Sequence, residues 1–187
     1  MANRELDYYR ALYEVARTIN SSLDLADVLE KVAKSTSEAM KVKACSIRLL
    51  SADRKRLVFG AAYGLSEGYL RKGAVEVDKS GVDRQVLRGN TVLIPDATED
   101  TRFQYPERAR EEGIRSLLVV PLATRGGIIG VMRVYTAEQR EFSDAEIEFL
   151  GLIADLSAVA IDNARLYQLL KGDYEMLVTF QDRLFDE

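Results

Sequence analysis

The spacing of apolar residues changes twice along this chain, and this change constrains the fold more than any other feature. Near both ends, apolar residues recur every three or four positions, as they do along one face of an amphipathic helix. In the middle they alternate with polar residues, as they do in a half-buried strand. A chain of 187 residues fits one domain of roughly 100 to 200 residues. The sequence therefore predicts an α/β fold of the α+β kind, in which helices flank a central antiparallel sheet.

Two of the predicted helices have well-marked ends. Asp24 can accept hydrogen bonds from the amides of the following turn, which predicts the start of a second helix that ends near Lys41. Phe142, Ser143 and Glu146 have the spacing of a hydrophobic staple and a capping box. We therefore expect the last helix to begin at Ser143.

The sheet is predicted from two hairpins. The alternating residues 44–50 are joined to residues 57–63 by a polar turn. Residues 116–122 and 128–135 flank a Thr-Arg-Gly-Gly sequence, which is a strong hairpin signal. Between the hairpins, short extended segments and short helices are expected at residues 74–77, 80–89, 91–94 and 106–113. The polar stretch at 96–105 is interpreted as a lid.

Composition and charge exclude several classes of protein. The formal net charge is -4 and the basic residues are scattered, so nucleic acid is not an expected partner. The apolar runs are far shorter than the roughly 20 residues that a membrane helix needs, so no membrane association is expected. A single cysteine and the lack of a secretion signal at the start favour a cytoplasmic location.

The side chains that usually carry catalysis are scarce. The chain has no histidine, which removes the commonest general base and metal ligand. No phosphate-binding loop of the Gly-x-x-x-x-Gly-Lys type is present. Cys45 lies on an apolar strand face and is interpreted as core packing, with redox sensing as the alternative. Asp53 and Glu99 are interpreted as solvated turn residues. We therefore expect no enzymatic activity, no metal site and no cofactor.

Three stretches of the sequence together resemble the GAF domain family. They are GIRSLLVVPLATRGGIIGVMRVY at 113–135, FSDAEIEFLGLIADLSAVAIDNARLY at 142–167, and LIPDATEDTRF at 93–103. The resemblance covers residues 23–167. It implies an antiparallel sheet with the terminal helices on one face and a lidded pocket on the other. It also implies a sensory or regulatory role, although the fold alone does not assign the ligand.

The sequence departs from the better-known ligand-binding patterns of this family. Bilin-binding members commonly pair their cysteine with a histidine, and members that reduce methionine sulfoxide use several cysteines. Neither pattern is met here. Cyclic-nucleotide-binding members commonly have an Asn-Lys pair, and Tyr135 and Thr136 stand near that position. Phe142 and Glu146, which match the rest of that pattern, are already explained by the helix start.

A ligand site is predicted on the lidded face of the sheet. Alternation places Arg48 and Arg133 on that face, and forked hydrogen bonds from two arginines would bind a carboxylate or a phosphate. The backbone amides at Ser80 and Gly81 would add donors if that helix start faces the pocket. The alternative is that the arginines pair with the lid carboxylates and only close the lid. The candidate site residues are Arg48, Tyr63, Asp96, Arg102, Phe103, Ser116 and Arg133.

The terminal helices are predicted to form a parallel homodimer. Eleven positions of the last helix follow alternating spacings of three and four, as in a coiled coil. These positions are Phe149, Leu152, Leu156, Val159, Asn163, Leu166, Leu170, Asp173, Leu177, Phe180 and Leu184. The alternative is a single helix whose far end frays. We expect three parts, with an N-terminal signalling helix at 1–22, the GAF domain at 23–167 and a helical extension at 168–187.

Two functions remain in competition at this stage. The first is a small-molecule sensor that signals through its terminal helices to an output domain or a signalling protein in trans. The second is a dimerisation or protein-interaction module with a vestigial pocket. Ligand-induced stabilisation of the fold separates the two, because a ligand of the native state must stabilise it.

Overall fold

A computed structural model of the chain describes the backbone of residues 2–21, 24–71 and 73–185. Its side chains are described for residues 6–20, 24–71, 73–172 and 174–175. The helices and strands are α1 (Ala2–Ser21), α2 (Leu25–Met40), β1 (Ala44–Leu50), β2 (Arg56–Tyr63), α3 (Glu67–Leu70), β3 (Val75–Glu76), η1 (Val77–Lys79), α4 (Gly81–Val86), β4 (Val92–Ile94), α5 (Pro106–Glu112), β5 (Ser116–Thr124), β6 (Gly127–Thr136) and α6 (Asp144–Phe185).

The strands form one antiparallel sheet with the order β3-β2-β1-β6-β5-β4. Both predicted hairpins are present, as the pairs β1–β2 and β5–β6. The first and last strands, β1 and β6, are neighbours at the centre, where Ser46 pairs with Arg133 and Arg48 with Val131. The centre of the sheet is therefore built from segments that are more than 80 residues apart in the chain.

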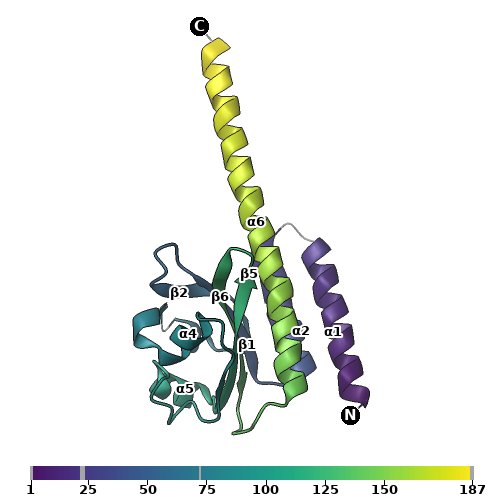
Figure 1. Cartoon of the computed structure of the whole chain (residues 1–187), viewed down its shortest axis with the longest axis vertical. Helices are drawn as coiled ribbons and strands as arrows, with labels where there is room; N and C mark the ends of the chain where they lie inside the picture. Colours follow the sequence, from purple (N-terminus) through teal and green to yellow (C-terminus); the bar gives the residue numbers. More distant parts are fainter. Residues whose placement is uncertain (1, 22–23, 72, 186–187) are drawn as a thin grey trace.

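Three long helices cover one face of the sheet. In Figure 1, α1, α2 and α6 lie on the same side of the strands, with α1 outermost. The buried apolar residues of this face come from every layer, including Val32 of α2, Ile47 of β1, Leu118 of β5 and Ile153 of α6. The ring of Tyr8 in α1 stacks on Phe149 of α6 at a centroid distance of 4.3 Å. We call this side the helix face.

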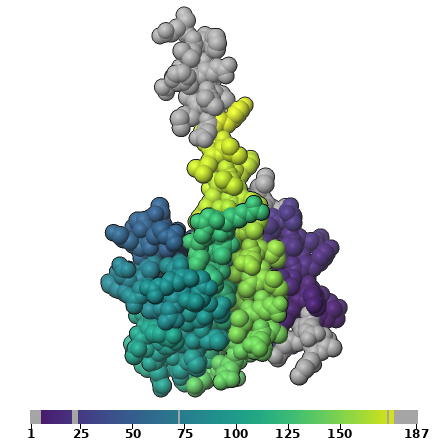
Figure 2. Space-filling view, in the orientation of Figure 1, coloured from purple at the N-terminus to yellow at the C-terminus, as the bar shows by residue number. Residues whose placement is uncertain are grey.

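The segment between the two hairpins covers the opposite face, which we call the loop face. Figure 2 shows these blue and teal residues gathered on the side of the sheet away from α1 and α6. A second apolar cluster lies beneath them and includes Leu57, Val86, Ile114 and Val119. The architecture is thus a sheet between two different layers, as the resemblance to the GAF family implied.

The helix ends follow the sequence signals. Asp24 accepts hydrogen bonds from the amides of Ala26 and Asp27, and Lys41 ends α2 in the left-handed conformation. At the start of α6, the Glu146 carboxylate accepts from the amide of Ser143, and the Ser143 hydroxyl accepts from the amide of Glu146. Both predicted helix starts are confirmed, because each depends on neighbouring residues only.

The last helix continues well past the body of the domain. Helix α6 has 42 residues, and its second half projects away from the sheet (Figure 1). The boundary predicted after residue 167 therefore lies inside one continuous helix. Among the helices of the described residues, none is both long and apolar enough to cross a membrane.

Candidate functional site

Two arginines are buried side by side on the loop face. Arg48 of β1 is 3% exposed and Arg133 of β6 is 2% exposed. Strand alternation puts Ser46 and Arg48 on one face, and the pairing of Ser46 with Arg133 brings the second arginine to the same face. Arg48 and Arg133 therefore lie on the same face of the sheet, as the sequence predicted.

Arg133 has a carboxylate partner that the sequence did not suggest. Its Nη2 donates to Oδ1 of Asp83 in α4, and both side chains are 2% exposed. Burial lowers the pKa of Arg133, but the Asp83 charge and hydrogen bond more than offset this effect and raise it above its ordinary value. Arg133 and Asp83 therefore form an internal ion pair, although the Nε of Arg133 has no hydrogen-bond partner.

Arg48 has no such partner. Its Nη1 donates to the carbonyls of Leu57 and Gly73 over long distances of 3.4 Å each, and its Nε has no hydrogen-bond partner. Among the described residues, no carboxylate forms an ion pair with it. Burial and the neighbouring charge of Arg133 both lower the pKa of Arg48. The structure thus contains a buried cation with no ion-pair partner of its own, because the nearby Asp83 carboxylate pairs with Arg133.

Two buried tyrosines complete this polar cluster. The Tyr135 hydroxyl lies 2.8 Å from the Ser46 hydroxyl, within hydrogen-bond distance. The ring of Tyr69 in α3 packs edge-on against Tyr135 at 6.2 Å. Burial raises the pKa of Tyr69 far above its ordinary value, so its hydroxyl stays neutral. The cluster therefore has two positive groups and one negative group.

Tyr63 does not lie on the loop face, contrary to the expectation. A β-bulge interrupts the pairing of β1 with β2, because Ile47 pairs with Ala61 while Arg48 pairs with Phe59. The extra residue is Gly60, where an added Cβ would lie 3.0 Å from a backbone oxygen. Past the bulge the alternation is reversed. Tyr63 consequently lies on the helix face, where its ring centroid is 6.0 Å from the Lys34 ammonium.

Ser116 is also absent from the arginine cluster. Its hydroxyl donates to the carbonyl of Pro95 and accepts from the amide of Arg140. Alternation along β5 places it on the same face as Leu118, which belongs to the helix-face core. Ser116 thus joins two loops at the end of the sheet, and strict alternation could have predicted this.

The carboxylates of Asp96 and Asp100 in the predicted lid pair with Arg115 and Arg102, and neither pairs with a buried arginine. Asp96 accepts from Arg115 at 2.5 Å, and Asp100 accepts from both Nε and Nη2 of Arg102. Phe103 is 9% exposed and packs in the loop-face cluster. The alternative in which Arg48 or Arg133 pairs with the lid carboxylates is therefore wrong, because Asp83 takes that role for Arg133.

The helix start at Ser80 is already occupied by the protein itself. The Gly81 amide donates to the carbonyl of Arg102 at 3.0 Å, and the Ser80 hydroxyl accepts from the amide of Asp83. The Ser80 hydroxyl also donates to Asp83 Oδ2 at 2.6 Å. These amides are thus not open to an anion, and they fasten the lid to α4.

The sequence contained a signal for Asp83 that was not used. Ser80 and Asp83 stand three residues apart, as the two polar residues of a capping box do. The Ser80 hydroxyl holds the carboxylate at the first turn of α4, and the packing of α4 on the sheet then brings it to Arg133. The first step can be predicted locally, whereas the second needs the tertiary fold.

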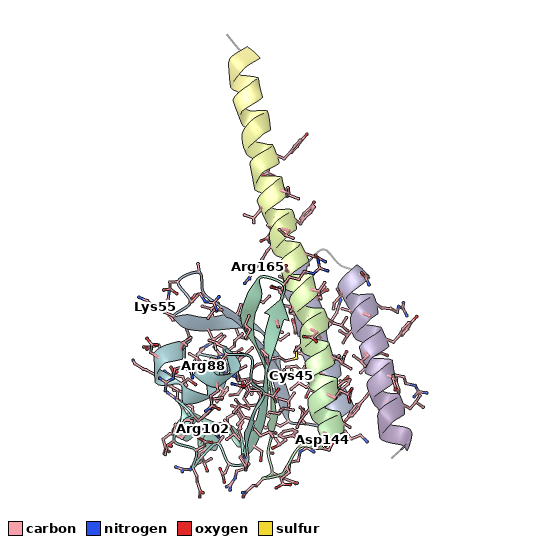
Figure 3. The ribbon with its side chains drawn as sticks, in the orientation of Figure 1. Cys45, Lys55, Arg88, Arg102, Asp144 and Arg165 are labelled. Carbon is pink, nitrogen blue, oxygen red and sulfur yellow. The ribbon has the colours of Figure 1, made fainter. Side chains whose placement is uncertain are left out.

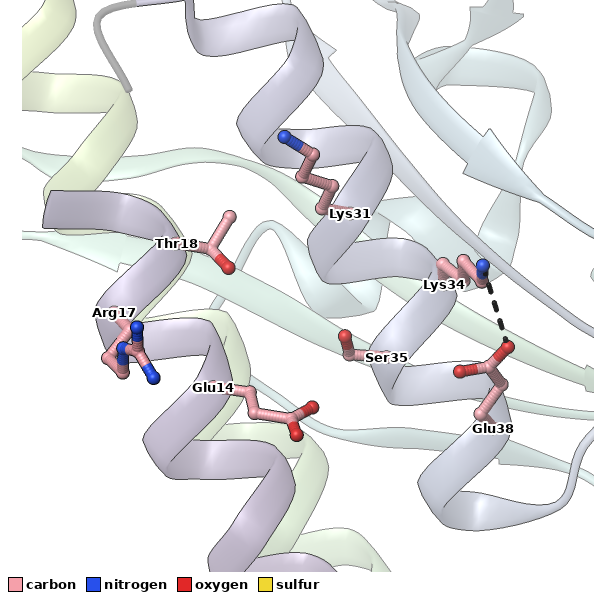
Figure 4. Close-up of a pocket in the computed structure, with 7 residues that line it drawn as sticks. All are labelled: Glu14, Arg17, Thr18, Lys31, Lys34, Ser35 and Glu38. Atoms are coloured by element: carbon pink, nitrogen blue, oxygen red, sulfur yellow. Dashed lines mark ion pairs between the residues drawn. The ribbon is translucent and has the colours of Figure 1, made fainter. Parts of the chain in front are cut away.

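A further groove lies on the outer side of the helix face. It has a volume of about 390 Å³ and runs between α1 and α2, lined by Glu14, Arg17, Thr18, Lys31, Lys34, Ser35 and Glu38. Figure 4 shows that its charged side chains are of both signs. The Lys34 ammonium and the Glu38 carboxylate lie 4.0 Å apart. Because these charges are exposed, water screens them, and the groove is a weaker candidate than the buried cluster.

Cys45 lies in the helix-face core, as predicted. Its thiol is fully buried between the sheet and the helices (Figure 3), and burial raises its pKa far above the ordinary value. A thiolate is the reactive form, so this environment favours core packing over redox sensing.

Comparison with known proteins gives the family. The GAF domain model matches residues 24–161, and the chain belongs to the GAF domain family. It is 28% identical over 180 residues to the formate hydrogenlyase transcriptional activator of Salmonella typhimurium strain SL1344, covering 94% of this chain and 26% of the activator. It is 26% identical over 183 residues to the methyl sulfide methyltransferase-associated sensor of Methanosarcina acetivorans, covering 92% of this chain and 18% of the sensor.

A solved structure supports the same assignment. The GAF domain of the Acinetobacter phosphoenolpyruvate-protein phosphotransferase superposes with a TM-score of 0.73 and 28% identity, covering 89% of this chain and 97% of that domain. The chain spans about a quarter or less of the length of the two curated relatives above. It is thus a GAF domain of the kind found in sensory and regulatory proteins.

Proposed function

We propose that this chain is a non-catalytic regulatory domain that binds a small anion beside Arg48 and signals its presence through α1 and α6. The uncompensated charge of Arg48 is the observation that carries this proposal. An isolated charge costs several kcal/mol to bury, by an order-of-magnitude estimate, unless a partner of opposite sign accompanies it. An anion bound at Arg48 would supply that partner.

The two buried arginines have different roles in this proposal. Arg133 is neutralised by Asp83, so it acts as a structural group that holds α4 on the sheet. Arg48 lies beside this pair and keeps its hydrogen-bonding capacity at Nε. The ligand site is therefore proposed at Arg48, and the lid residues Asp96, Arg102 and Phe103 close the loop face around it.

The terminal helices provide a route for the signal. Arg48 lies next to Ile47 on β1, and Ile47 belongs to the helix-face core, in which β1 packs against α2. A change in the position of β1 on ligand binding would therefore act on α2 directly, and on α1 and α6 through their packing against α2. We propose that the output lies in a further domain or a partner protein, as the large regulators that contain related segments suggest.

Binding of simple anions tests the proposed site. Acetate, nitrate and inorganic phosphate would be titrated against protein shown by mass spectrometry to be ligand-free, at constant ionic strength. We expect at least one to raise the melting temperature of the wild type but not of Arg48→Met. Arg125→Met, the same substitution at an exposed arginine of the β5–β6 turn, is the matched control. Equal stabilisation of all three proteins would disprove a site at Arg48.

The dimerisation module is the second candidate, and exposed apolar residues on α6 favour it. Leu152, Val159 and Leu166 are seven residues apart and 46%, 54% and 54% exposed, and Leu170 continues the stripe. Phe149 does not belong to this surface, because Tyr8 covers it. The predicted positions Asp173, Leu177, Phe180 and Leu184 have side chains outside the described residues. We propose that a second copy packs in parallel along this stripe.

A second groove, between α1 and α6, continues the exposed apolar stripe of α6. A groove of about 200 Å³ between α1 and α6 is lined by Tyr8, Tyr9, Leu12, Ala145, Glu148, Phe149 and Leu152. Tyr9 and Tyr13 of α1 are 71% and 65% exposed beside it. An apolar surface of this extent along two adjacent helices fits the interface of a homodimer.

Sedimentation of paired variants tests the dimer. Leu166→Glu places a charge on the stripe, whereas Gln168→Glu places the same charge on the opposite side of α6. We expect a wild-type dimer at micromolar concentration that Leu166→Glu dissociates and Gln168→Glu leaves intact. A wild-type monomer at that concentration would contradict the dimer and leave the anion site unaffected.

A further inference from the structure

An exposed aromatic residue lies directly beside the uncompensated arginine. Phe59 of β2 is the register partner of Arg48 on β1, so their side chains leave the same face of the sheet. Phe59 is 52% exposed, while Arg48 is 3% exposed. The pair thus presents a buried charge next to an open apolar surface.

The bulge at Gly60 creates this arrangement. Before the bulge, Leu57 and Phe59 face the loop side, and Leu57 belongs to the loop-face core. After it, Ala61 belongs to the helix-face core. A regular strand would have placed all of these residues on one face, with the aromatic wall extended to Tyr63. The bulge leaves Phe59 as the aromatic side chain of β2 on the loop face.

The arginine side chain extends toward this edge of the sheet. Its Nη1 reaches the carbonyl of Leu57 on β2 and that of Gly73, which precedes β3. The guanidinium therefore lies across β2, two residues from Phe59 along the strand. A ligand that approaches Arg48 from the β2–β3 edge would contact the Phe59 ring.

The charge count of the cluster limits the charge of the ligand. Arg48 and Arg133 contribute two positive charges and Asp83 contributes one negative charge. Tyr69 stays neutral because burial raises its pKa. A ligand with one negative charge makes the cluster neutral, whereas a second negative charge would be buried without a partner.

We propose that the ligand is a small monocarboxylate with an apolar or aromatic body, bound with its carboxylate at Arg48 and its body against Phe59. This inference rests on the proposed function and specifies the class of ligand. A carboxylate accepts two parallel hydrogen bonds from a guanidinium, which suits the free Nε of Arg48. An aromatic ring gains additional affinity from packing on Phe59.

Calorimetric titration with four matched probes tests the inference. Benzoate carries both the charge and the ring, acetate lacks the ring, benzamide lacks the charge, and phthalate carries a second charge. We expect benzoate to bind more tightly than any of the other three. Phe59→Ala should weaken the affinity for benzoate about two- to tenfold, which is the range expected for the loss of one aromatic contact. The affinity for acetate should not change.

A neighbouring residue supplies the control. Val58 is 37% exposed and pairs with Leu49, so it lies on the opposite face of the same strand. Val58→Ala should leave benzoate affinity unchanged. If benzoate and acetate bind equally and Phe59→Ala affects neither, the inference is wrong and the anion site stands. If phthalate binds most tightly, the restriction to one charge is wrong. If no probe binds, or Arg48→Met binds benzoate as the wild type does, the proposed function fails as well.

Discussion

The two faces of the sheet are built from different physical interactions, although they share the same strands. Ile47 and Arg48 are consecutive on β1, and Ile47 packs in the helix-face core while Arg48 lies beside the buried pair of Arg133 and Asp83. On the helix face, stability comes mainly from apolar burial. On the loop face, an apolar cluster is joined by two buried arginines and one buried aspartate, so stability also depends on how these charges are paired. Substitutions on the helix face should preserve stability if they keep the volume of the core. Substitutions on the loop face must also keep the buried charges paired.

This difference teaches where a small ligand can have a large effect. Adding an apolar group to a filled core causes strain, whereas adding an anion beside an uncompensated cation removes an energetic penalty. The loop face can therefore respond to a ligand, and the helix face can transmit the response. Four substitutions test this contrast.

The largest effect is expected at the buried ion pair. Asp83→Asn keeps the shape of the side chain but leaves Arg133 buried without its counter-charge, which should lower the free energy of unfolding by about 3 to 5 kcal/mol. Urea denaturation measures the loss. Glu111→Gln removes an ion pair with Arg108 of 2.9 Å that is exposed, so it should change stability little. A loss at Asp83 no greater than that at Glu111 would show that the loop face does not depend on this pair.

A comparable loss is expected at the neighbouring core position. Ile47 is fully buried, and Ile47→Ala should lower the free energy of unfolding by about 2 to 5 kcal/mol through lost burial and a cavity. The measurement is again urea denaturation. Val58 lies on the same face but is 37% exposed, so Val58→Ala should lower the free energy of unfolding much less. Similar losses for the two variants would argue against a closed helix face.

A smaller, pH-dependent effect is expected at the start of α6. Burial raises the pKa of Glu146, but its hydrogen bonds with the Ser143 amide and Arg140 more than offset this and hold it below its ordinary value. Glu146→Gln should therefore lower stability by about 1 kcal/mol at neutral pH.

The sign of the pH dependence follows from the depressed pKa. The charge of Glu146 stabilises the fold above the pKa of the unfolded chain, and this contribution is lost as pH falls through the lower pKa of the folded protein. The stabilities of the wild type and of Glu146→Gln should thus converge in acid. A difference that stays constant from neutral to strongly acidic pH would contradict the charged role of this carboxylate.

The smallest effect on the ligand-free fold is expected at Arg48. Arg48→Met removes the uncompensated charge and keeps an apolar side chain of similar length, so stability should stay the same or rise slightly. Arg133→Met leaves Asp83 buried without a counter-charge, so it should lower the free energy of unfolding by several kcal/mol, as Asp83→Asn does. If both arginine variants lose stability equally, Arg48 is compensated within the fold, and the case for an anion there fails.

Much of the fold could be predicted because its signals are local. The helix start at Ser143 depends on Glu146 three residues later, and both hairpins follow from alternation with a polar or glycine-containing turn. The convergence of Arg48 and Arg133 also followed, once β1 and β6 were taken as neighbours. The caps and hairpins require no knowledge of how distant segments pack, whereas the convergence of the arginines also needed β1 and β6 to be neighbours.

Two of the errors in the candidate site, those at Tyr63 and Asp83, have a common physical origin. Strict alternation along β2 predicted Tyr63 on the loop face, but the extra residue at Gly60 moves its side chain to the helix face. Asp83 was missed because its meeting with Arg133 is a contact across 50 residues of sequence. Both errors concern the relation between segments, which residue spacing does not encode.

Residue order alone therefore specified which segments form helices and strands, and how the side chains of β1 and β6 alternate between the two buried faces. Capping and alternation act over a few residues, so they leave a readable pattern in the chain. The three-dimensional packing was needed to show that Asp83 neutralises one arginine, that Arg48 lacks a partner and that Phe59 stands beside it. Charge compensation is a property of groups that meet in space, and the helices and loops that enclose the sheet select which groups meet.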